Sequence, residues 1–143
     1  MDRALSEAHA AAQRGEVPVG AIVVRGATIV GAAGNRTREF NDPTAHAEIL
    51  AIREACGNLQ QERLEGCDLY VTLEPCTMCA AAISFARIRR LYFAAEDAKG
   101  GAVTSGVRFF ASPTCHHAPE IYPGIGEAAA ASLLKSFFSE RRQ

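Results

Sequence analysis

The sequence has no long apolar run and no strong excess of charge of either sign. Apolar residues make up 48% of the chain and charged residues 22%, which is the balance of an ordinary soluble globular protein. No apolar run approaches the roughly 18 residues of a membrane span, so we expect no membrane association. The formal net charge of −1 gives no overall attraction to nucleic acid, so any RNA site must be a local patch.

The chain also lacks the features of a secreted protein. Its five cysteines are an odd number, and two of them stand at metal-ligand spacing, which favours a reducing cytoplasm over a disulfide framework. Met1-Asp2-Arg3 leads into an alanine-rich helical pattern and not into a secretion signal. No repeat, linker or low-complexity tract divides the 143 residues. We therefore expect a single cytoplasmic domain over residues 1–143.

Helical and extended patterns alternate along the chain. We expect helices at 2–14, 42–56, 76–87 and 127–141, strands at 17–24, 27–33, 67–73 and 90–95, and room for a short fifth strand in the loop-rich segment 96–124. In the second helix Asp42 is the expected cap, Pro43 the first residue and Gly57 the stop. In the last helix the residues expected to be buried are Ala131, Leu134, Phe137 and Phe138. This order predicts an α/β fold of three layers, with a central mixed sheet of about five strands and helices on both faces.

Two short motifs carry the chemistry, His46-Ala47-Glu48 and Pro75-Cys76-Thr77-Met78-Cys79. Cys76 and Cys79 stand three apart at a helix start, so their sulfurs project from one face, and the helix dipole favours their thiolates. Together with His46 they supply three ligands for Zn²⁺ and leave a fourth coordination position for water. Glu48 is then placed to carry the proton of that water, and we expect apolar surroundings to raise its pKa.

The spacing of His46 and Glu48 limits the local backbone, because residues two apart on a regular helix point about 200° away from each other. We therefore expect this helix to become regular only around His46. A structural zinc site is one alternative, but it normally has a fourth protein ligand, and Cys56, Cys67 and Cys115 stand at no matching spacing. A chance cluster without metal is the other alternative.

The pattern H-x-E followed by P-C-x-x-C is the known signature of zinc-dependent nucleobase deaminases. The sequence around it resembles the bacterial tRNA adenosine deaminases of the cytidine deaminase superfamily over nearly the whole chain, in the segments EVPVGAIVV, GNRT, NDPTAHAEI, LYVTLEPCTMCAAAI, RIRRLYFAAEDAKGGA and SFFSERR. The resemblance implies a cytidine-deaminase-like α/β/α fold, a single zinc deaminase domain and one Zn²⁺ per subunit. It also implies hydrolysis of adenosine to inosine at the wobble position of a tRNA anticodon, on the anticodon stem-loop.

The resemblance further implies roles for individual residues. His46, Cys76 and Cys79 match the zinc ligands and Glu48 the proton carrier, while the matches to RNA-contacting positions are Asn35, Asp97, Lys99, Phe138 and Arg142. Each of the last five has an ordinary alternative, as a turn residue, a solvated loop pair, a core side chain or an exposed terminal side chain. The family forms homodimers, and the apolar helix from Cys79 to Ala86 suits such an interface, although it suits a monomer core equally well.

Two rival functions remain open at this point. A guanine or cytosine base deaminase, or a nucleoside deaminase, shares both motifs and the fold, and a non-catalytic zinc-stabilised RNA-binding module belongs to another class. The basic residues offer phosphate contacts if they converge at the pocket mouth, and otherwise a solvated surface: Arg87, Arg89, Arg90, Lys99, Arg108, Arg141 and Arg142. The run Cys115-His116-His117 is interpreted as a structural or surface cluster.

Overall fold

The computed structural model describes residues 1–141 and leaves Arg142 and Gln143 undescribed. Its elements are α1 (Asp2–Gln13), β1 (Gly20–Arg25), β2 (Thr28–Gly34), α2 (Ala47–Leu59), β3 (Cys67–Leu73), α3 (Thr77–Phe85), β4 (Arg90–Ala95), the short 3₁₀ turn η1 (Phe109–Ala111), β5 (Glu120–Pro123) and α4 (Glu127–Arg141). Among these residues no helix is long and apolar enough to cross a membrane.

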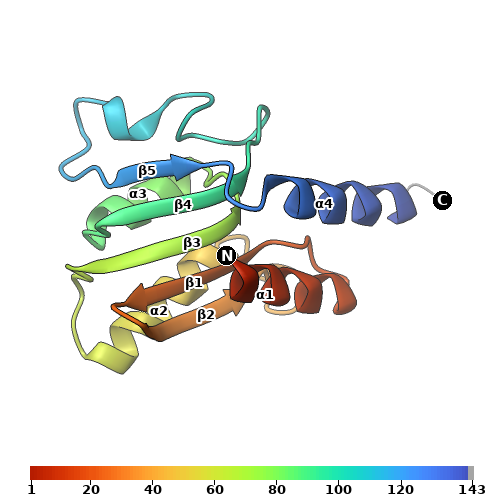
Figure 1. Cartoon of the computed structure of the whole chain (residues 1–143), viewed down its shortest axis with the longest axis horizontal. Helices are drawn as coiled ribbons and strands as arrows, with labels where there is room; N and C mark the ends of the chain where they lie inside the picture. The colour runs from red at the N-terminus through yellow and green to blue at the C-terminus, as the bar shows by residue number, and fades with distance from the viewer. Residues whose placement is uncertain (142–143) are drawn as a thin grey trace.

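One mixed sheet organises the fold, with the strand order β2-β1-β3-β4-β5. β1 runs antiparallel to β2 and β3, whereas β3, β4 and β5 are parallel to one another. Figure 1 shows α2 and α3 behind this sheet and α1 and α4 in front of it. The predicted three-layer α/β/α fold with five strands is therefore confirmed.

The main core lies between the sheet and the pair α2 and α3. β3 and β4 contribute the fully buried side chains Leu69, Val71, Leu91 and Phe93 to this face, and these alternate with the half-buried Tyr70 and Tyr92 on the other face. α2 packs directly onto β2, because a Cβ on Gly31 would overlap the backbone carbonyl of Ala51. This close contact fixes the position of α2, and with it the start of that helix, relative to the sheet.

The segment before α2 differs from the expectation. Asp42 does not begin a helix: its Oδ1 accepts hydrogen bonds from the backbone N–H of Thr44 at 2.8 Å and from its hydroxyl at 2.7 Å, which closes a turn. The helix starts five residues later, with His46 as its N-cap in an extended conformation (φ −73°, ψ 153°). The expectation that the helix becomes regular only around His46 is confirmed. The predicted start at Asp42-Pro43 is wrong.

Other boundaries shift for local reasons. β1 begins at Gly20 and not at Val17, since the N–H of Val19 bonds the carbonyl of Val17 at 2.8 Å in a turn around Pro18. α2 continues through Gly57 to Leu59 and ends at Gln60, whose left-handed backbone (φ 52°) stops it. α3 ends at Phe85, two residues before the predicted end.

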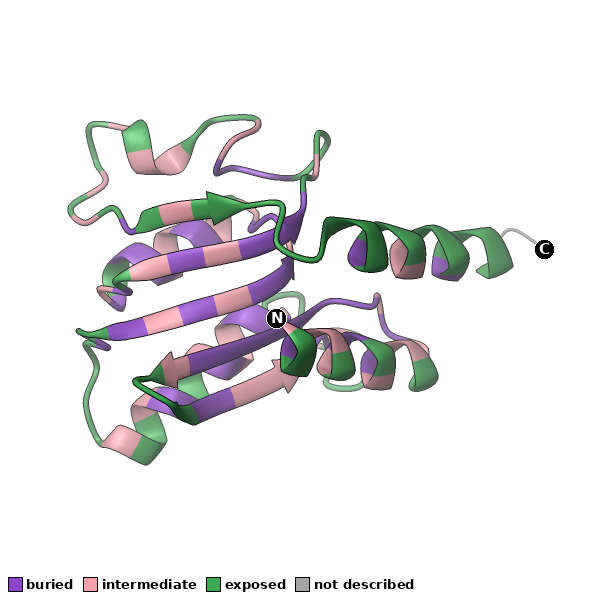
Figure 2. Cartoon of the chain, viewed as in Figure 1, coloured by how far each residue is buried: buried purple, intermediate pink, exposed green. Residues whose placement is uncertain are grey.

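The last helix has the predicted bounds, but only part of its predicted buried face is confirmed: Phe137 is buried and Leu134 is half-buried. Ala130 and Phe137 are its buried residues, whereas Ala131 is exposed and Phe138 is 45% exposed. Most of α4 is exposed along its length, and it extends past the edge of the sheet (Figure 2). The helix therefore presents most of its surface to solvent or to a partner.

Candidate active site

Two helix N-termini meet at the end of β3. His46 is the N-cap of α2, and Cys76 is the N-cap of α3, which follows β3 after the short link Glu74-Pro75. An N-cap residue has an extended backbone, so its side chain can turn away from the helix surface. Both helices therefore direct a metal-ligand side chain toward the same point.

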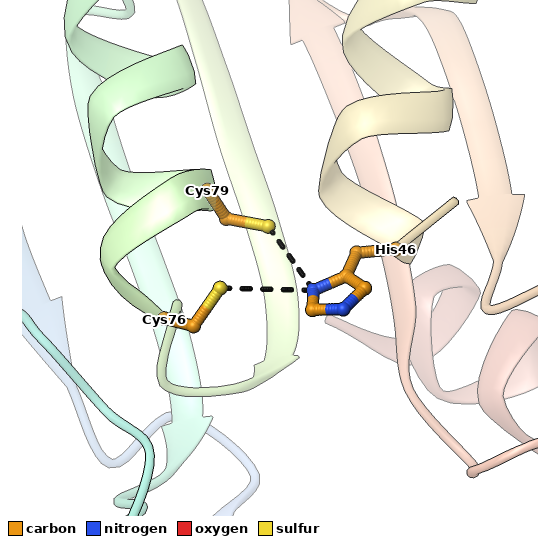
Figure 3. Close-up of side chains that lie close together, drawn as sticks. All are labelled: His46, Cys76 and Cys79. Atoms are coloured by element: carbon orange, nitrogen blue, oxygen red, sulfur yellow. Dashed lines mark hydrogen bonds between the residues drawn. The ribbon is translucent and has the colours of Figure 1, made fainter. Parts of the chain in front are cut away.

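The three predicted ligands come together there. The Nδ1 atom of His46 lies 3.7 Å from the Sγ of Cys76 and 3.5 Å from the Sγ of Cys79 (Figure 3). A tetrahedral zinc ion with ordinary Zn–N and Zn–S bond lengths separates a nitrogen ligand from a sulfur ligand by about 3.6 Å. The two nitrogen–sulfur distances in the structure therefore match those around a bound zinc ion. In residues 1–141 they form the only such group of three or more ligand side chains.

The two thiols differ in their readiness to ionise. Hydrogen bonding from the Cys79 thiol lowers the pKa of Cys76 to about 4, and the contact with His46 acts in the same direction. The hydrogen bond to Cys76 and burial both raise the pKa of Cys79. The pair by itself therefore carries one negative charge, and a cation between the sulfurs favours the second thiolate. This donor set fits Zn²⁺.

Glu48 lies in the first turn of α2 and is buried, at 4% exposure. Burial raises the pKa of its carboxyl to about 7, because the charged form loses its hydration. Both protonation states are then accessible near neutral pH, which is the property that a general acid–base group needs. The expected effect of the apolar surroundings on Glu48 is confirmed.

A pocket of about 340 Å³ opens onto these groups. His46, Glu48 and Cys76 line it from the helix side, and the other lining residues are Val17, Val19, Asn35, Thr37, Leu73, Glu74, Asp97 and Gly100. This volume suits a small ring system such as a nucleobase, and the apolar side chains of Val17, Val19 and Leu73 stand beside polar groups that converge on it, as in a ligand site.

Of the five positions matched to RNA contacts, the structure brings two into this pocket. Asn35 is buried and uses its Nδ2 group to donate to Glu16 at 3.4 Å and to Thr37 at 3.2 Å, so its Oδ1 keeps acceptor capacity. Asp97 also lines the pocket, and its Oδ1 accepts from the N–H groups of Lys99 and Gly100. Lys99 and Phe138 are exposed, and Arg142 falls beyond the residues that the structure describes.

The arginines at the start of β4 do not lie at the pocket mouth. Arg89 and Arg90 stand at the start of β4, whereas the pocket follows the ends of β3 and β4, about 17 Å further along the strands. Arg89 bonds Asp68 at 3.0 Å and Arg90 bonds Glu120 at 2.8 Å, so each guanidinium is already paired with a carboxylate. Arg87, Arg89 and Arg90 line one shared groove at that far end, so of the two alternatives left open for them the structure favours a surface away from the pocket.

The Cys115-His116-His117 run is structural. Cys115 Sγ lies 3.6 Å from the hydroxyl of buried Ser84, and that hydroxyl accepts from the N–H of His117 at 3.3 Å. The Nε2 of His117 is 2.8 Å from the carbonyl oxygen of Ile88 and is its donor. These bonds attach the long loop after η1 to α3, and within residues 1–141 the run belongs to no group of three or more metal-ligand side chains.

Two buried carboxylates at the pocket were missed by the sequence analysis. Glu16 accepts from the backbone N–H groups of Arg38 at 3.1 Å and Glu39 at 2.8 Å, and so holds the loop that follows Asn35. Glu74 holds the loop on the other side, through the N–H groups of Asp97, Val103, Thr104 and Ser105 and the Ser105 hydroxyl, at 2.9–3.0 Å. The sequence did contain a signal for Glu74: in VTLEP a single acidic residue stands directly beside an apolar strand, which indicates a buried carboxylate with specific partners.

The Glu74 site is fully organised around a charged group. Burial acts to raise the pKa of Glu74, but the N–H donors from Asp97, Val103 and Ser105 outweigh it and hold the pKa below its usual value. Gly101 lies so close that a Cβ there would overlap the Glu74 carboxylate. The carboxylate therefore acts as an internal anchor for residues 97–105.

Comparison with known proteins agrees with this site. Residues 1–95 match the family model for the cytidine and deoxycytidylate deaminase zinc-binding region. The chain is 64% identical to a tRNA-specific adenosine deaminase of Agrobacterium fabrum, over 99% of this chain and 93% of that protein. It is 40% identical to a tRNA-specific adenosine deaminase of Bacillus subtilis, over 100% and 89% of the two chains.

Solved structures give the same result. The chain is similar, with a TM-score of 0.92 and 65% identity over 94% of this chain and 97% of the other, to a structure from studies of A-to-I editing by tRNA:A34 deaminases at the wobble position of transfer RNA. A guanine deaminase of Bacillus subtilis is more distant, with a TM-score of 0.65 and 31% identity over 99% and 91% of the two chains.

Replacing a single sulfur ligand should remove the metal. We expect Cys79→Ala to reduce bound zinc from about one ion per chain to near zero after dialysis against a mild chelator, because two ligands do not hold zinc. Cys56→Ala is the matched control, since this thiol lies near the other end of α2, packs at the edge of the core and donates to the Glu62 carbonyl at 3.8 Å. Metal analysis by mass spectrometry decides the question, and full zinc in Cys79→Ala would contradict the ligand assignment.

The anchor role of Glu74 is testable by an isosteric change. Glu74→Gln replaces one acceptor oxygen by an NH₂ group that faces backbone donors, and we expect it to lower the free energy of unfolding by roughly 2–4 kcal/mol. Glu96→Gln makes the same change at an exposed site whose carboxylate accepts only from the Thr104 hydroxyl at 3.4 Å. It should stay within about 0.5 kcal/mol of the unmodified protein in urea denaturation. Equal effects of the two substitutions would count against the anchor.

Proposed function

Because the chain belongs to the tRNA-specific adenosine deaminases, within the cytidine and deoxycytidylate deaminase zinc-binding family, we propose that it hydrolyses adenosine to inosine at the wobble position of a tRNA anticodon. The observation that carries this proposal is the position of Glu48. A buried carboxyl with a pKa of about 7 shares one pocket with the zinc ligands His46 and Cys76.

The residues of the site have two separate roles, zinc binding and proton transfer. His46, Cys76 and Cys79 hold the zinc ion, which when bound lowers the pKa of a water so that it is nucleophilic at neutral pH. Glu48 removes a proton from the attacking water and delivers it to the ring nitrogen of the base. It then takes up the second proton and transfers it to the departing amine, so that ammonia leaves as a neutral molecule.

Asn35 and Asp97 position the nucleotide. The Oδ1 of Asn35 is available to accept a hydrogen bond from a nucleotide in the pocket, while Glu16 and Thr37 fix its amide through Nδ2. Asp97 and Lys99 lie on the loop held by Glu74, where they can contact nucleotides next to the reacting base. A target base must leave its stack to enter such a pocket, which suits the unpaired bases of an anticodon loop.

The rival is a free-base or nucleoside deaminase with guanine or cytosine as its substrate. The fold and the zinc motifs are common to both functions, and a guanine deaminase is among the similar structures. The RNA substrate is favoured because identity to the tRNA-specific enzyme is 64%, against 31% to the guanine deaminase, at similar coverage of the chain.

A substrate assay with a Glu48 variant tests the proposal. We expect the protein to release ammonia from an adenosine-containing anticodon stem-loop and not from guanine, cytosine or cytidine. Glu48→Gln should keep its zinc and its RNA affinity but lose about 10²–10⁴-fold in kcat, because the proton carrier is gone.

Three outcomes of this assay would contradict the proposal. Ammonia from a small molecule alone would favour the rival deaminase. Unchanged turnover in Glu48→Gln would remove the proton-carrier role and favour a zinc-stabilised RNA-binding module. Loss of zinc together with turnover would instead make Glu48 part of the metal site.

We also propose that the protein is a cytoplasmic homodimer, with α2 and α3 at the interface. All five cysteines are free thiols, which suits a reducing compartment and access to tRNA. α3 is not buried all round: Phe85 is 71% exposed, beside a groove of about 610 Å³ between α2 and α3 whose apolar lining includes Ile49, Ile52 and Ala82. A second copy of the chain is the occupant that the homodimers of the family suggest.

Light scattering measures this directly. We expect the unmodified protein to have twice the mass of the chain and Phe85→Glu to shift toward the monomer, because a buried charge at the interface costs several kcal/mol unless it is paired. Val107→Glu is the control, at another exposed apolar residue (66% exposed) outside this groove. A monomeric unmodified protein, or a dimer unaffected by Phe85→Glu, would contradict this interface.

A further inference from the structure

We propose that Arg14, Arg36, Arg38 and Arg141 form a phosphate-binding surface, here called the arginine surface, which holds the RNA backbone beside the reacting nucleotide. This inference rests on the proposed RNA substrate. The four residues come from the end of α1, the loop after β2 and the end of α4. In Figure 1 the C-terminal ends of α1 and α4 point the same way, beyond the end of the sheet where β3 and β4 finish.

These segments enclose a groove next to the pocket. Its volume is about 650 Å³, and its lining residues are Arg14, Gly15, Glu16, Arg38, Glu39 and Arg141. Arg14 joins groove and pocket, because its Nη2 donates to the backbone carbonyl of the pocket residue Asn35 at 3.2 Å. An RNA strand whose base occupies the pocket therefore has this groove within reach of its neighbouring phosphates.

The arginine side chains are held in place without losing their charge. Arg38 Nη1 and Arg141 Nη2 both donate to the carbonyl oxygen of Gly15, at 3.3 and 2.8 Å. A carbonyl is a neutral acceptor, so each guanidinium keeps its full positive charge and most of its N–H donors. The Arg141 guanidinium also lies 4.5 Å above the ring of Phe137, which orients it further. Preorganised forks of this kind are suited to phosphate oxygens.

Acidic residues in the region do not cancel this charge. Glu39 lies 2.6 Å from Arg36 and 3.8 Å from Arg14. Both carboxylate oxygens of buried Glu16 already accept hydrogen bonds from backbone N–H groups. Four guanidiniums thus face two carboxylates. Arg89 and Arg90, at the far end of the strands, are each paired with a carboxylate, as Arg36 is, whereas Arg38 and Arg141 bond the neutral carbonyl of Gly15.

Exposed aromatic side chains accompany the arginines. Phe40 is 51% exposed and lies 5.9 Å from the Arg36 guanidinium, measured to the ring centroid. Phe138 is 45% exposed and lies beside Phe137 on α4, with 5.4 Å between the ring centroids. Single-stranded RNA is bound by arginines along its backbone and by aromatic rings on which unpaired bases stack. The combination points to a looped RNA and not to a free nucleoside.

The salt dependence of RNA binding tests the arginine surface. An adenosine-containing anticodon stem-loop is titrated with the zinc-loaded protein at several salt concentrations. We expect Arg36→Gln/Arg38→Gln to weaken binding and to reduce the slope of log affinity against log salt by about two, near one for each phosphate that no longer meets a guanidinium. KM should rise while kcat at saturating RNA changes less than twofold. The matched control Arg89→Gln/Arg90→Gln should keep both affinity and slope.

Removal of a negative charge from the arginine surface distinguishes a direct effect on RNA binding from an effect of misfolding. Glu39→Gln removes the one exposed carboxylate among these arginines, so we expect tighter RNA binding and a steeper salt slope, which a misfolded loop would not produce. Arg141→Gln, at the far end of α4, should reduce the slope by about one without touching the 36–39 loop.

The results for the arginine surface and for the proposed function can be told apart. Unmodified protein that fails to deaminate the stem-loop would contradict the function itself. Active unmodified protein, with arginine variants that keep its affinity and slope, would contradict only the arginine surface. Equal losses in the Arg36/Arg38 and Arg89/Arg90 variants would do the same, because they would show a diffuse effect of charge.

Discussion

The active site depends on one local conformation, the extended N-cap at the start of a helix. His46 and Cys76 both occupy this position. An N-cap residue stands outside the helical spiral, so its side chain need not follow the 100° step per residue of the helix. His46 can therefore bind a metal while Glu48, two residues later, faces the same pocket from the first helical turn. A His-x-Glu motif inside a regular helix would place the two groups on opposite sides.

The pocket is also bordered by two loops that are held in place by hydrogen bonds. Each loop is held by a buried carboxylate that accepts several backbone N–H groups, Glu16 beside Asn35 and Glu74 beside Asp97. A carboxylate can serve donors from three or four consecutive residues at once, which no neutral side chain can do. Burying these charges costs free energy, and the N–H donors offset it only in the closed arrangement of the loops. The site is thereby preorganised by groups that do not take part in the reaction.

The sequence predicts those parts of this molecule that depend on local pattern. The bounds of β3 and β4 were predicted to the residue, and the zinc ligands followed from two short motifs. The start of α2 was not, because Asp42 accepting an N–H two residues ahead closes a turn with the same chemistry that caps a helix. The burial of Phe137 and the exposure of Phe138 could not be told apart from local pattern either. Both are apolar and adjacent on α4, and only the element that packs against the helix decides which of them is buried.

The position of charge around the pocket could not be predicted either, because it depends on residues far apart in the chain. Arg141 reaches Gly15 across 126 residues of sequence. The separation between this charge and Glu48 has a physical reason. A guanidinium beside Glu48 would hold the pKa of its carboxyl low and leave it a weak base. Phosphates, in contrast, need accessible guanidiniums in a hydrated groove. The fold meets both demands by keeping Glu48 buried behind the pocket and the arginines on the surface next to Asn35, so that one strand of RNA can engage both.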